Sequence, residues 1–341
     1  MKTDSLNAQP ARGYTKRGFW EENRRSGGYL LRRTLKSGTI SVVRWLLVFG
    51  LCFMIVQPLI MRLATSLMPE KELYDSTIIL LPRTVTLDNF RIVFELVDMP
   101  RAMLNSLWTS LIMSVCQIIS TTLVAYGFAR YDFPLKKFWF GCVVALIIIP
   151  PQTFASSLYV FFTNFDILGL FKLITGKTKN LRGSITPYML MSLTCMGLKN
   201  GLYIYMLRQY FRGVPKSLEE AAFVDGCGTL RTFFKIMLPD AMPVIMSCFL
   251  FSFVWQWTDL FYTRNFLSNY SILSTQLDGI VTRMGHYFNA NRDGAVVQVS
   301  AGRRAQLISI GVLICSTPLI ILYIFAQRTF VESITMTGTK M

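Results

Sequence analysis

The sequence predicts an all-α membrane protein with six transmembrane helices and a cytoplasmic loop between the fourth and fifth of them. Of the 341 residues, 52% are hydrophobic and only 16% are charged, which is too apolar for a soluble protein of this size. Several apolar stretches approach the ~20 residues that cross a bilayer. The basic residues, which give a net charge of +16, are spread among these stretches. Membrane orientation therefore explains them better than a nucleic-acid partner.

The chain begins with a predicted basic cytoplasmic arm, residues 1–44, which is rich in Arg and Lys. The first span is predicted over residues 45–63, and Pro58 is expected to break it late. Residues 64–101 carry six acidic side chains and are placed outside the cell. The other five spans are predicted at 104–128, 138–160, 185–207, 244–261 and 305–325.

Proline and glycine interrupt two of these spans. The adjacent Pro150 and Pro151 are expected to break the third, because proline cannot continue a helix and restricts the residue before it. The fourth contains Gly197 and Lys199 and is expected to be less regular and buried among other helices. A polar connection at 163–184 is predicted to be a loop.

An even number of spans places both termini and the loop 208–243 on one face of the membrane. That face, which also holds the tail 327–341, carries the larger excess of Lys and Arg over Asp and Glu. By the positive-inside rule, this face is cytoplasmic. The loop is therefore expected where a soluble partner could bind it.

The loop begins with signals for a short helix. Pro215 precedes Ser217, which is a predicted N-cap, and Glu220 stands three residues later to complete a capping box. Gly226 and Gly228 are predicted to end this helix in left-handed conformations. A second, amphipathic helix is then predicted by apolar residues at helical spacing, namely Leu230, Phe233, Phe234, Ile236 and Leu238, before Pro239 interrupts it.

The spacing of Glu220-Ala221-Ala222, Gly226, Ile236 and Leu238-Pro239 matches the EAA motif of membrane subunits of bacterial ABC importers. This resemblance implies the type I ABC importer permease fold and a coupling helix that binds a separate ATP-binding subunit. The residues to which it assigns ATPase coupling are Ser217, Glu219, Glu220, Ala221, Ala222, Asp225, Gly226, Ile236, Leu238 and Pro239.

A larger part of the chain, about residues 85–341, resembles the carbohydrate permeases related to the second membrane subunit of the maltose transporter. The similar stretches are LDNF at 87–90, NSLWTS at 105–110, AYGFAR at 125–130, IPPQ at 149–152, RQYF at 208–211 and QR at 327–328. The chain departs from that pattern in its long amino terminus, an apparent insertion at 171–184, Thr258 in place of asparagine and Glu332 in place of glycine.

The resemblance implies a multi-pass protein of a bacterial plasma membrane with both termini in the cytoplasm. It also implies four kinds of partner: a second, homologous permease subunit, two ATP-binding subunits, an extracytoplasmic solute-binding protein and the lipid bilayer. ATP and Mg²⁺ would be bound by the ATP-binding subunits and no cofactor by this chain. The cargo implied is a carbohydrate, and within that class an oligosaccharide.

Candidate residues on a solute pathway are polar or aromatic side chains within the spans, since a sugar needs hydrogen bonds and aromatic faces. They are Asn105, Gln117, Tyr126, Gln152, Trp255, Gln256 and Asp259. A simpler interpretation exists for Trp255, as for the nearby Trp257, because tryptophan is favoured at membrane interfaces in any case. Glu220 could likewise serve only as a helix cap, and Asp225 could be either solvated or paired with a partner's basic residue.

Two other functions remain open from the sequence. An importer of a peptide or a phosphate ester would share the coupling loop. A secondary transporter is disfavoured because the six spans show no internal second half and few intramembrane charges. An enzyme is not expected, because the sequence has no GxxxxGK[ST] phosphate loop, nucleophile–base pair or metal-binding cluster of residues.

Overall fold

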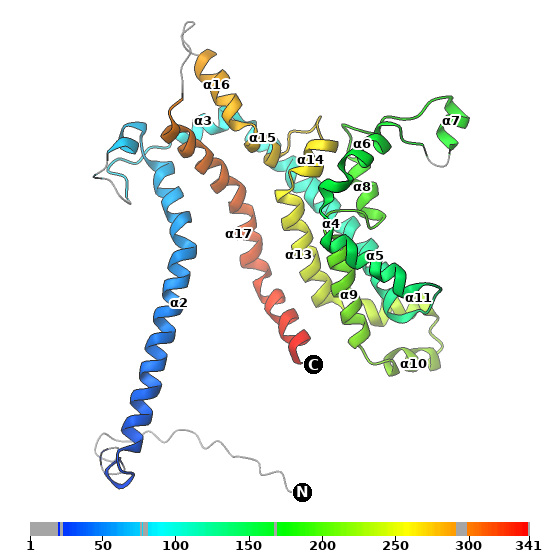
Figure 1. Cartoon of the computed structure of the whole chain (residues 1–341), viewed down its shortest axis with the longest axis horizontal. Helices are drawn as coiled ribbons and strands as arrows, with labels where there is room; N and C mark the ends of the chain where they lie inside the picture. Colours follow the sequence, from blue (N-terminus) through cyan, green and yellow to red (C-terminus); the bar gives the residue numbers. More distant parts are fainter. Residues whose placement is uncertain are drawn as a thin grey trace. The chain divides into compact units, whose positions relative to one another are not determined.

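The computed structural model describes residues 20, 23–75, 77, 81–166, 169–290 and 299–339 (Figure 1). The chain divides into two units, residues 1–61 and 62–341. Most of the first half of the predicted arm lies outside the described residues. Within the described part, the secondary structure is helical and no strand is present beyond an isolated bridge between Phe165 and Lys179.

Helix α2, Tyr29–Leu67, is longer than the first predicted span at 45–63. It starts inside the segment predicted as an arm, and Pro58 lies within it without ending it. The prediction that Pro58 breaks the span is therefore wrong. Proline removes only a local hydrogen bond, and membrane helices tolerate that loss where the remaining residues continue the helix.

Helix α4, Met99–Arg130, is the centre of the second unit and packs against α8, α9 and α13. It includes the predicted span 104–128. Its buried face consists largely of small and hydroxyl-bearing residues, among them Ser106, Ser110, Ser114 and Thr121. Such residues allow membrane helices to approach closely and to bond across the interface.

The third predicted span, 138–160, consists of α5 (Lys136–Ile148), the short 3₁₀ helix η2 (Pro151–Phe154) and α6 (Ala155–Thr163). The chain bends by 105° between α5 and the segment formed by η2 and α6. Ile149 has an extended conformation, with φ −74° and ψ 122°, as expected before a proline. The predicted break at Pro150 and Pro151 is confirmed, but the range is not one straight helix.

The fourth predicted span, 185–207, is not a continuous helix either. Helix α8, Thr186–Leu193, and helix α9, Asn200–Gly213, are separated by residues 194–199. Two residues in that break, Cys195 and Lys199, have positive φ angles of 59° and 62°. We call residues 194–199 the α8–α9 break.

Helices α13, Met242–Thr258, and α17, Ala301–Thr339, complete the bundle, and they pack against each other. Helix α13 ends three residues before the predicted limit at 261, because Asp259 has an extended backbone. Helix α17 continues through most of the predicted tail, 327–341. Most of the segment predicted as a cytoplasmic tail is therefore helical.

Shorter helices occupy the segments predicted to connect the spans. They are η1 (Glu70–Tyr74), α3 (Asp88–Leu96), α7 (Leu170–Thr175), α14 (Phe261–Phe266), α15 (Leu273–Asp278) and α16 (Ile280–Ala290). The connection 163–184, predicted as a loop, therefore contains the helix α7. Gly169 and Gly176 flank α7, and both have positive φ angles.

Three helices in the described residues are long and apolar enough to cross a membrane: 34–67, 99–130 and 301–327. The number rises to five if each of two bent helix pairs is one span. One pair is the α5 to α6 segment, and the other joins residues 229–240 to α13 with a bend of 73°. The predicted total of six is not reproduced, because α8 and α9 are each too short.

Candidate functional site: the coupling loop and a membrane pocket

Helix α10, Ser217–Val224, is the short helix predicted in the loop, but it starts differently from the prediction. The N-cap is Lys216, whose φ of −65° and ψ of −28° are already helical, and no side chain caps the helix. The amides of Glu219 and Glu220 both donate to the Lys216 carbonyl, at 3.0 and 3.1 Å. The predicted capping box between Ser217 and Glu220 is therefore wrong, because Ser217 already lies within the helix.

The end of α10 is a Schellman motif. The Gly226 amide donates to the Phe223 carbonyl at 3.0 Å, and the Cys227 amide donates to the Ala222 carbonyl at 2.9 Å. Gly226 has a φ of +76°, as predicted. Gly228 has a φ of −73° and an extended conformation, so the prediction of a second left-handed glycine is wrong.

The second helical segment of the loop comprises α11 (Thr229–Thr232), the π-helical turn η3 (Phe233–Met237) and α12 (Leu238–Asp240). Phe233 and Met237 are buried, whereas Leu230 and Phe234 are exposed. The predicted apolar stripe is therefore not a single buried face. The wider π turn changes the angle between successive residues, so a 3.6-residue period misplaces the residues around it.

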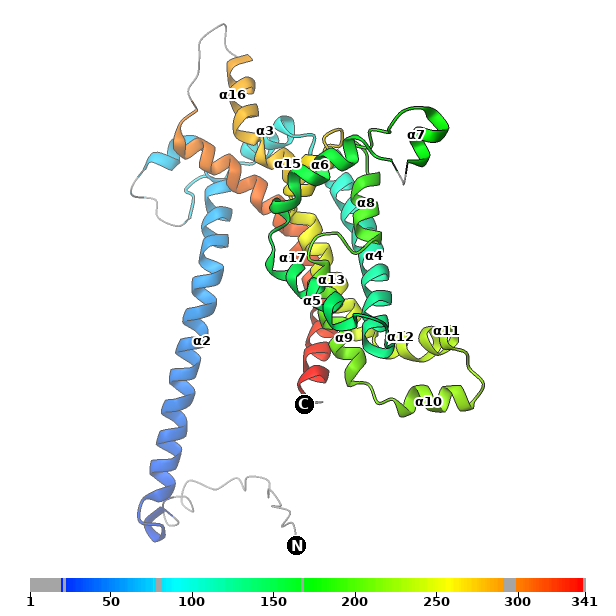
Figure 2. The ribbon, with the colours of Figure 1, turned by 45° about the vertical axis from the view of Figure 1, so that its right-hand side comes forward.

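Figure 2 shows α10 and α11 lying beside each other and joined by a turn, with the end of α9 leading into α10. We call this turn the glycine corner. Several of the exposed side chains at this corner are apolar or acidic. Val224 is 88% exposed and Leu230 is 75% exposed. We define the coupling surface as the exposed residues Glu220, Ala221, Phe223, Val224, Asp225 and Leu230.

Two motif residues face inward instead. Ala222 is buried, and Glu219 is only 9% exposed. The Glu219 Oε1 atom accepts a hydrogen bond from the Tyr126 hydroxyl at 2.8 Å and lies 3.3 Å from Arg130 Nε. Of the two adjacent glutamates, only Glu220 is therefore available on the surface. Phe223 and Val224 belong to the coupling surface although they are not motif positions. The sequence could have indicated them, because they are two adjacent apolar residues shortly before the glycine corner.

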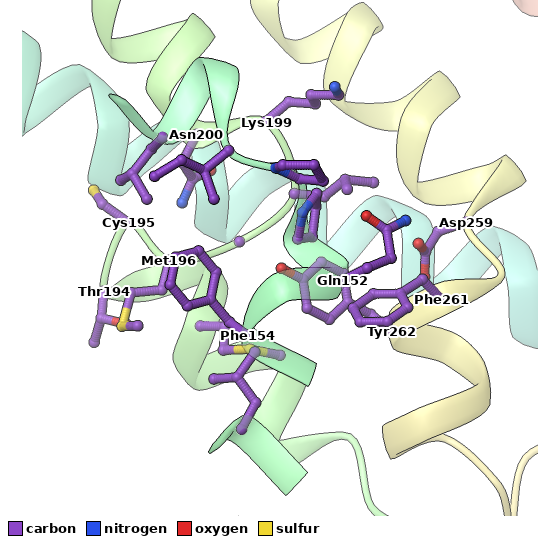
Figure 3. Close-up of a pocket in the computed structure, with 18 of the residues that line it drawn as sticks. Gln152, Phe154, Thr194, Cys195, Met196, Lys199, Asn200, Asp259, Phe261 and Tyr262 are labelled. Atoms are coloured by element: carbon purple, nitrogen blue, oxygen red, sulfur yellow. The ribbon is translucent and has the colours of Figure 1, made fainter. Parts of the chain in front are cut away.

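A cavity of about 1440 Å³ lies in the second unit. Its walls come from the bend between α5 and α6, the α8–α9 break and the end of α13. In Figure 3, Thr194, Cys195 and Met196 lie on one side of it, and Asp259 and Tyr262 lie on the other. We call this cavity the membrane pocket.

Three of the predicted solute residues line the membrane pocket: Gln152, Trp255 and Asp259. Sequence reasoning missed Lys199, whose Nζ atom lies 5.0 Å from the centre of the Trp255 ring. The signal for it was a lysine within an apolar run, which by itself suggests a functional position. The pocket thus combines aromatic surface with a few polar groups, the usual composition of a ligand site.

The other predicted solute residues have contacts within the protein. The Gln117 Nε2 atom donates to the Leu198 carbonyl at 2.5 Å, and Gln256 Nε2 donates to Gln117 Oε1 at 3.1 Å. These contacts hold the α8–α9 break against α4 and α13. Asn105 donates to the Ser271 carbonyl at 3.0 Å. Tyr126 contacts Glu219, as described above, and is not among the residues that line the membrane pocket.

Metal-ligand chemistry has no site in the part of the chain that the structure describes. No group of three or more His, Cys, Asp or Glu side chains in those residues is placed to hold an ion. The one histidine, His286, lies in α16. All seven cysteines are free.

The chain is similar to known transport permeases over most of its length. It is 26% identical to the arabinooligosaccharides transport system permease protein AraQ of Halalkalibacterium halodurans, covering 90% of this chain and all of that protein. It is also 26% identical to the trehalose transport system permease protein SugB of Mycobacterium tuberculosis, covering 83% of this chain and 92% of that one.

A solved structure has the same fold. It is the crystal structure of a bacterial ABC transporter involved in the import of the acidic polysaccharide alginate, and one of its chains matches with a TM-score of 0.63. The match covers 86% of this chain and 98% of the other at 16% identity. The predicted all-α importer permease fold is confirmed, and the protein is a membrane protein and part of a transporter complex with other subunits. Residues 117–335 match the model of one family, and the chain belongs to that family, the inner membrane components of binding-protein-dependent transport systems.

Proposed function

We propose that this chain is one of two membrane subunits of an ATP-driven importer that passes a carbohydrate from an external binding protein to the cytoplasm. The relatives support a carbohydrate, since their names refer to arabinooligosaccharides, trehalose and galactooligosaccharides. The sugars named differ from one relative to the next, so we propose only the class of cargo and no single sugar.

The coupling surface is the observation that supports this proposal most directly. Large apolar side chains such as Val224 and Leu230 are costly to expose to water, and exposed apolar groups rimmed by charge mark protein-binding surfaces. The Schellman motif fixes the shape of the corner that presents them. We infer that this surface binds a separate ATP-binding subunit in the cytoplasm. ATP and Mg²⁺ bind to that subunit, and its closure drives the membrane subunits between inward-open and outward-open states.

The membrane pocket supports a path for the cargo. Trp255 and Phe154 provide aromatic faces on which a sugar ring can stack, and Gln152 and Lys199 provide hydrogen-bond donors. Because the pocket lies beside the bent α5–α6 segment, movement of these helices would open or close it. In this proposal the second, homologous permease subunit covers the remaining sides of the path.

Co-purification tests the proposed partner. The wild-type chain, purified in detergent from its native membrane, is expected to retain an ATP-binding subunit. The Val224→Glu variant should lose that subunit, because the change places a charge in the centre of an apolar contact. Leu173→Glu is a matched control, since Leu173 in α7 is 83% exposed and lies outside the coupling surface. Equal retention in both variants would refute the assignment of the surface.

Binding measurements test the cargo. The solute-binding protein that co-purifies with the complex is expected to bind an oligosaccharide and to show no affinity for peptides or phosphate esters. Preferential binding of a peptide or a phosphate ester would keep the importer but refute its carbohydrate cargo. Uptake driven by an ion gradient without ATP would instead assign the chain to secondary transport.

A further inference from the structure

We propose that Tyr126, Arg130 and Glu219 form a clamp that makes the coupling helix α10 move together with α4. Motion of an ATP-binding subunit would then reach the membrane helices directly through α4, in addition to passing along the chain into α9 and α13. This inference rests on the proposed function, because it concerns how movement at the coupling surface is transmitted. It assigns a positioning role to three residues, none of which is exposed on the coupling surface.

The clamp joins parts of the chain that are far apart in sequence. The Tyr126 hydroxyl donates to Glu219 across 93 residues, at 2.8 Å. The Arg130 Nε atom is 3.3 Å from the same oxygen, which is an ion-pair distance, although the geometry is not that of a hydrogen bond. Arg130 instead donates from Nη2 to the Val214 carbonyl at 2.8 Å. One arginine at the end of α4 therefore contacts both α10 and the segment that leads into it.

Burial of both side chains distinguishes this ion pair from the other ion pairs among the described residues. The side chains of Arg130 and Glu219 are 6% and 12% exposed, whereas the exposed pair Arg91 and Glu95 shows 82% and 42%. A buried charge that loses its partner is left without water or counter-charge, which is strongly unfavourable. The pair therefore resists separation when α10 is displaced, while an exposed pair would simply exchange its partner for water.

Aromatic packing holds the third member in place. The Tyr126 ring lies 5.4 Å from the ring of Phe211 in α9 and 4.7 Å from that of Phe233 in η3. Phe211 and Phe233 are both nearly completely buried. Tyr126 is thus fixed between the two arms of the loop, one before and one after the glycine corner. Its hydroxyl is therefore held where it donates a hydrogen bond to Glu219.

The clamp also has a structural connection to the membrane pocket. Gln117 lies on α4, 13 residues before Arg130, a distance of about 20 Å along a helix that rises 1.5 Å per residue. Gln117 bonds to the Leu198 carbonyl in the α8–α9 break, which lines the pocket. A displacement of α4 at Arg130 is therefore applied to the break through a hydrogen bond that already exists.

Two substitutions test the clamp with little change in shape. Glu219→Gln removes the charge, and Tyr126→Phe removes only the hydroxyl. The assay reconstitutes the complete complex in proteoliposomes with its loaded binding protein, and it measures sugar uptake and ATP hydrolysis in the same sample. We expect both variants to keep their ATP-binding subunits. In Glu219→Gln the ratio of sugar transported to ATP hydrolysed should fall about fivefold or more, the lower end of typical coupling between sites.

Tyr287→Phe is the matched control, because the Tyr287 hydroxyl donates to Glu95 at 2.7 Å and links α16 to α3. This variant loses the same kind of hydrogen bond and should keep the wild-type ratio. The double variant Tyr126→Phe/Glu219→Gln should be no worse than Glu219→Gln alone, since both changes disrupt one contact. This non-additivity and the ratio are quantities that a general loss of stability would not change.

A wild-type ratio in Glu219→Gln would overturn the clamp. Loss of the ATP-binding subunits from both variants would also overturn it, because the contact would then serve docking. These results differ from a failure of the proposed function, in which the wild-type complex itself would contain no ATP-binding subunit.

Discussion

Substitution of two neighbouring glycines in the coupling loop isolates the effect of backbone conformation. Gly226 has a φ of +76°, whereas Gly228 has a φ of −73°. A Cβ atom added at either position would have nothing within 4 Å. Gly226→Ala therefore adds no steric clash, and its cost is that of an L-residue in a left-handed conformation, about 1–2 kcal/mol. Gly228→Ala has no such cost, because a φ of −73° suits any L-residue; it replaces a glycine N-cap and is expected to weaken the corner less than Gly226→Ala.

This cost should appear as weaker binding of the ATP-binding subunit. A free energy of about 1–2 kcal/mol lowers the ratio of the correct corner conformation to the alternatives by about 5–30-fold, and we expect Kd to rise by up to that factor. The assay titrates the purified ATP-binding subunit against the permease complex in nanodiscs and compares the Kd values of the two alanine variants. Gly226→Asn is expected to bind better than Gly226→Ala, because asparagine adopts positive φ more readily.

Equal Kd values for Gly226→Ala and Gly228→Ala would refute this reasoning. If Gly226→Asn bound as weakly as Gly226→Ala, the cause would be close contact with the partner's backbone at this position, and the account based on strain would be wrong.

The structure makes two further predictions. Gly201→Ala should destabilise the protein by about 1–3 kcal/mol, because the new Cβ would lie 2.7 Å from the Val143 carbonyl oxygen and force α9 away from α5. Its Tm in thermal unfolding should be lower than that of Gly213→Ala, a control on the same helix where the added Cβ meets no atom within 4 Å. Equal Tm values would contradict the close contact. The hydrogen bond from Thr84 holds the pKa of the Glu72 carboxyl below its usual value. The stabilisation that the ionised carboxyl gives to the backbone at Thr84 is therefore present above the ordinary pKa and is lost as the pH falls through the lowered pKa. Hydrogen exchange at the Thr84 amide, corrected for its intrinsic pH dependence, should accelerate over that range, and Glu72→Gln should remove the pH dependence.

Local signals predicted much of the fold. The apolar run predicts α4 and the proline pair predicts the end of α5, because both features depend on residues close in sequence. The α8–α9 break could not be predicted in the same way. It is held partly by Gln117, which lies 81 residues from Leu198, so its stability comes from tertiary contact. Pro58 illustrates the reverse case, in which a strong local signal had no large effect on the helix.

The candidate sites show the same contrast between local signals and tertiary contacts. The EAA spacing located the loop because its signals lie within one short segment. It could not tell which of two adjacent glutamates is exposed, since Glu219 is buried by Tyr126 and Arg130 from a distant helix. Gln117 was a reasonable solute residue by chemical type. Only the structure revealed that its hydrogen-bonding groups are already engaged within the protein.

Uptake of a labelled oligosaccharide by proteoliposomes tests the central claim most directly. The vesicles would contain the complete complex of this chain, its permease partner and its ATP-binding subunits, with the binding protein added outside. The account predicts uptake that requires both internal ATP and the binding protein, and that is lost in Val224→Glu but kept in Leu173→Glu. Uptake that persists without ATP, or that is unaffected by Val224→Glu, would contradict it.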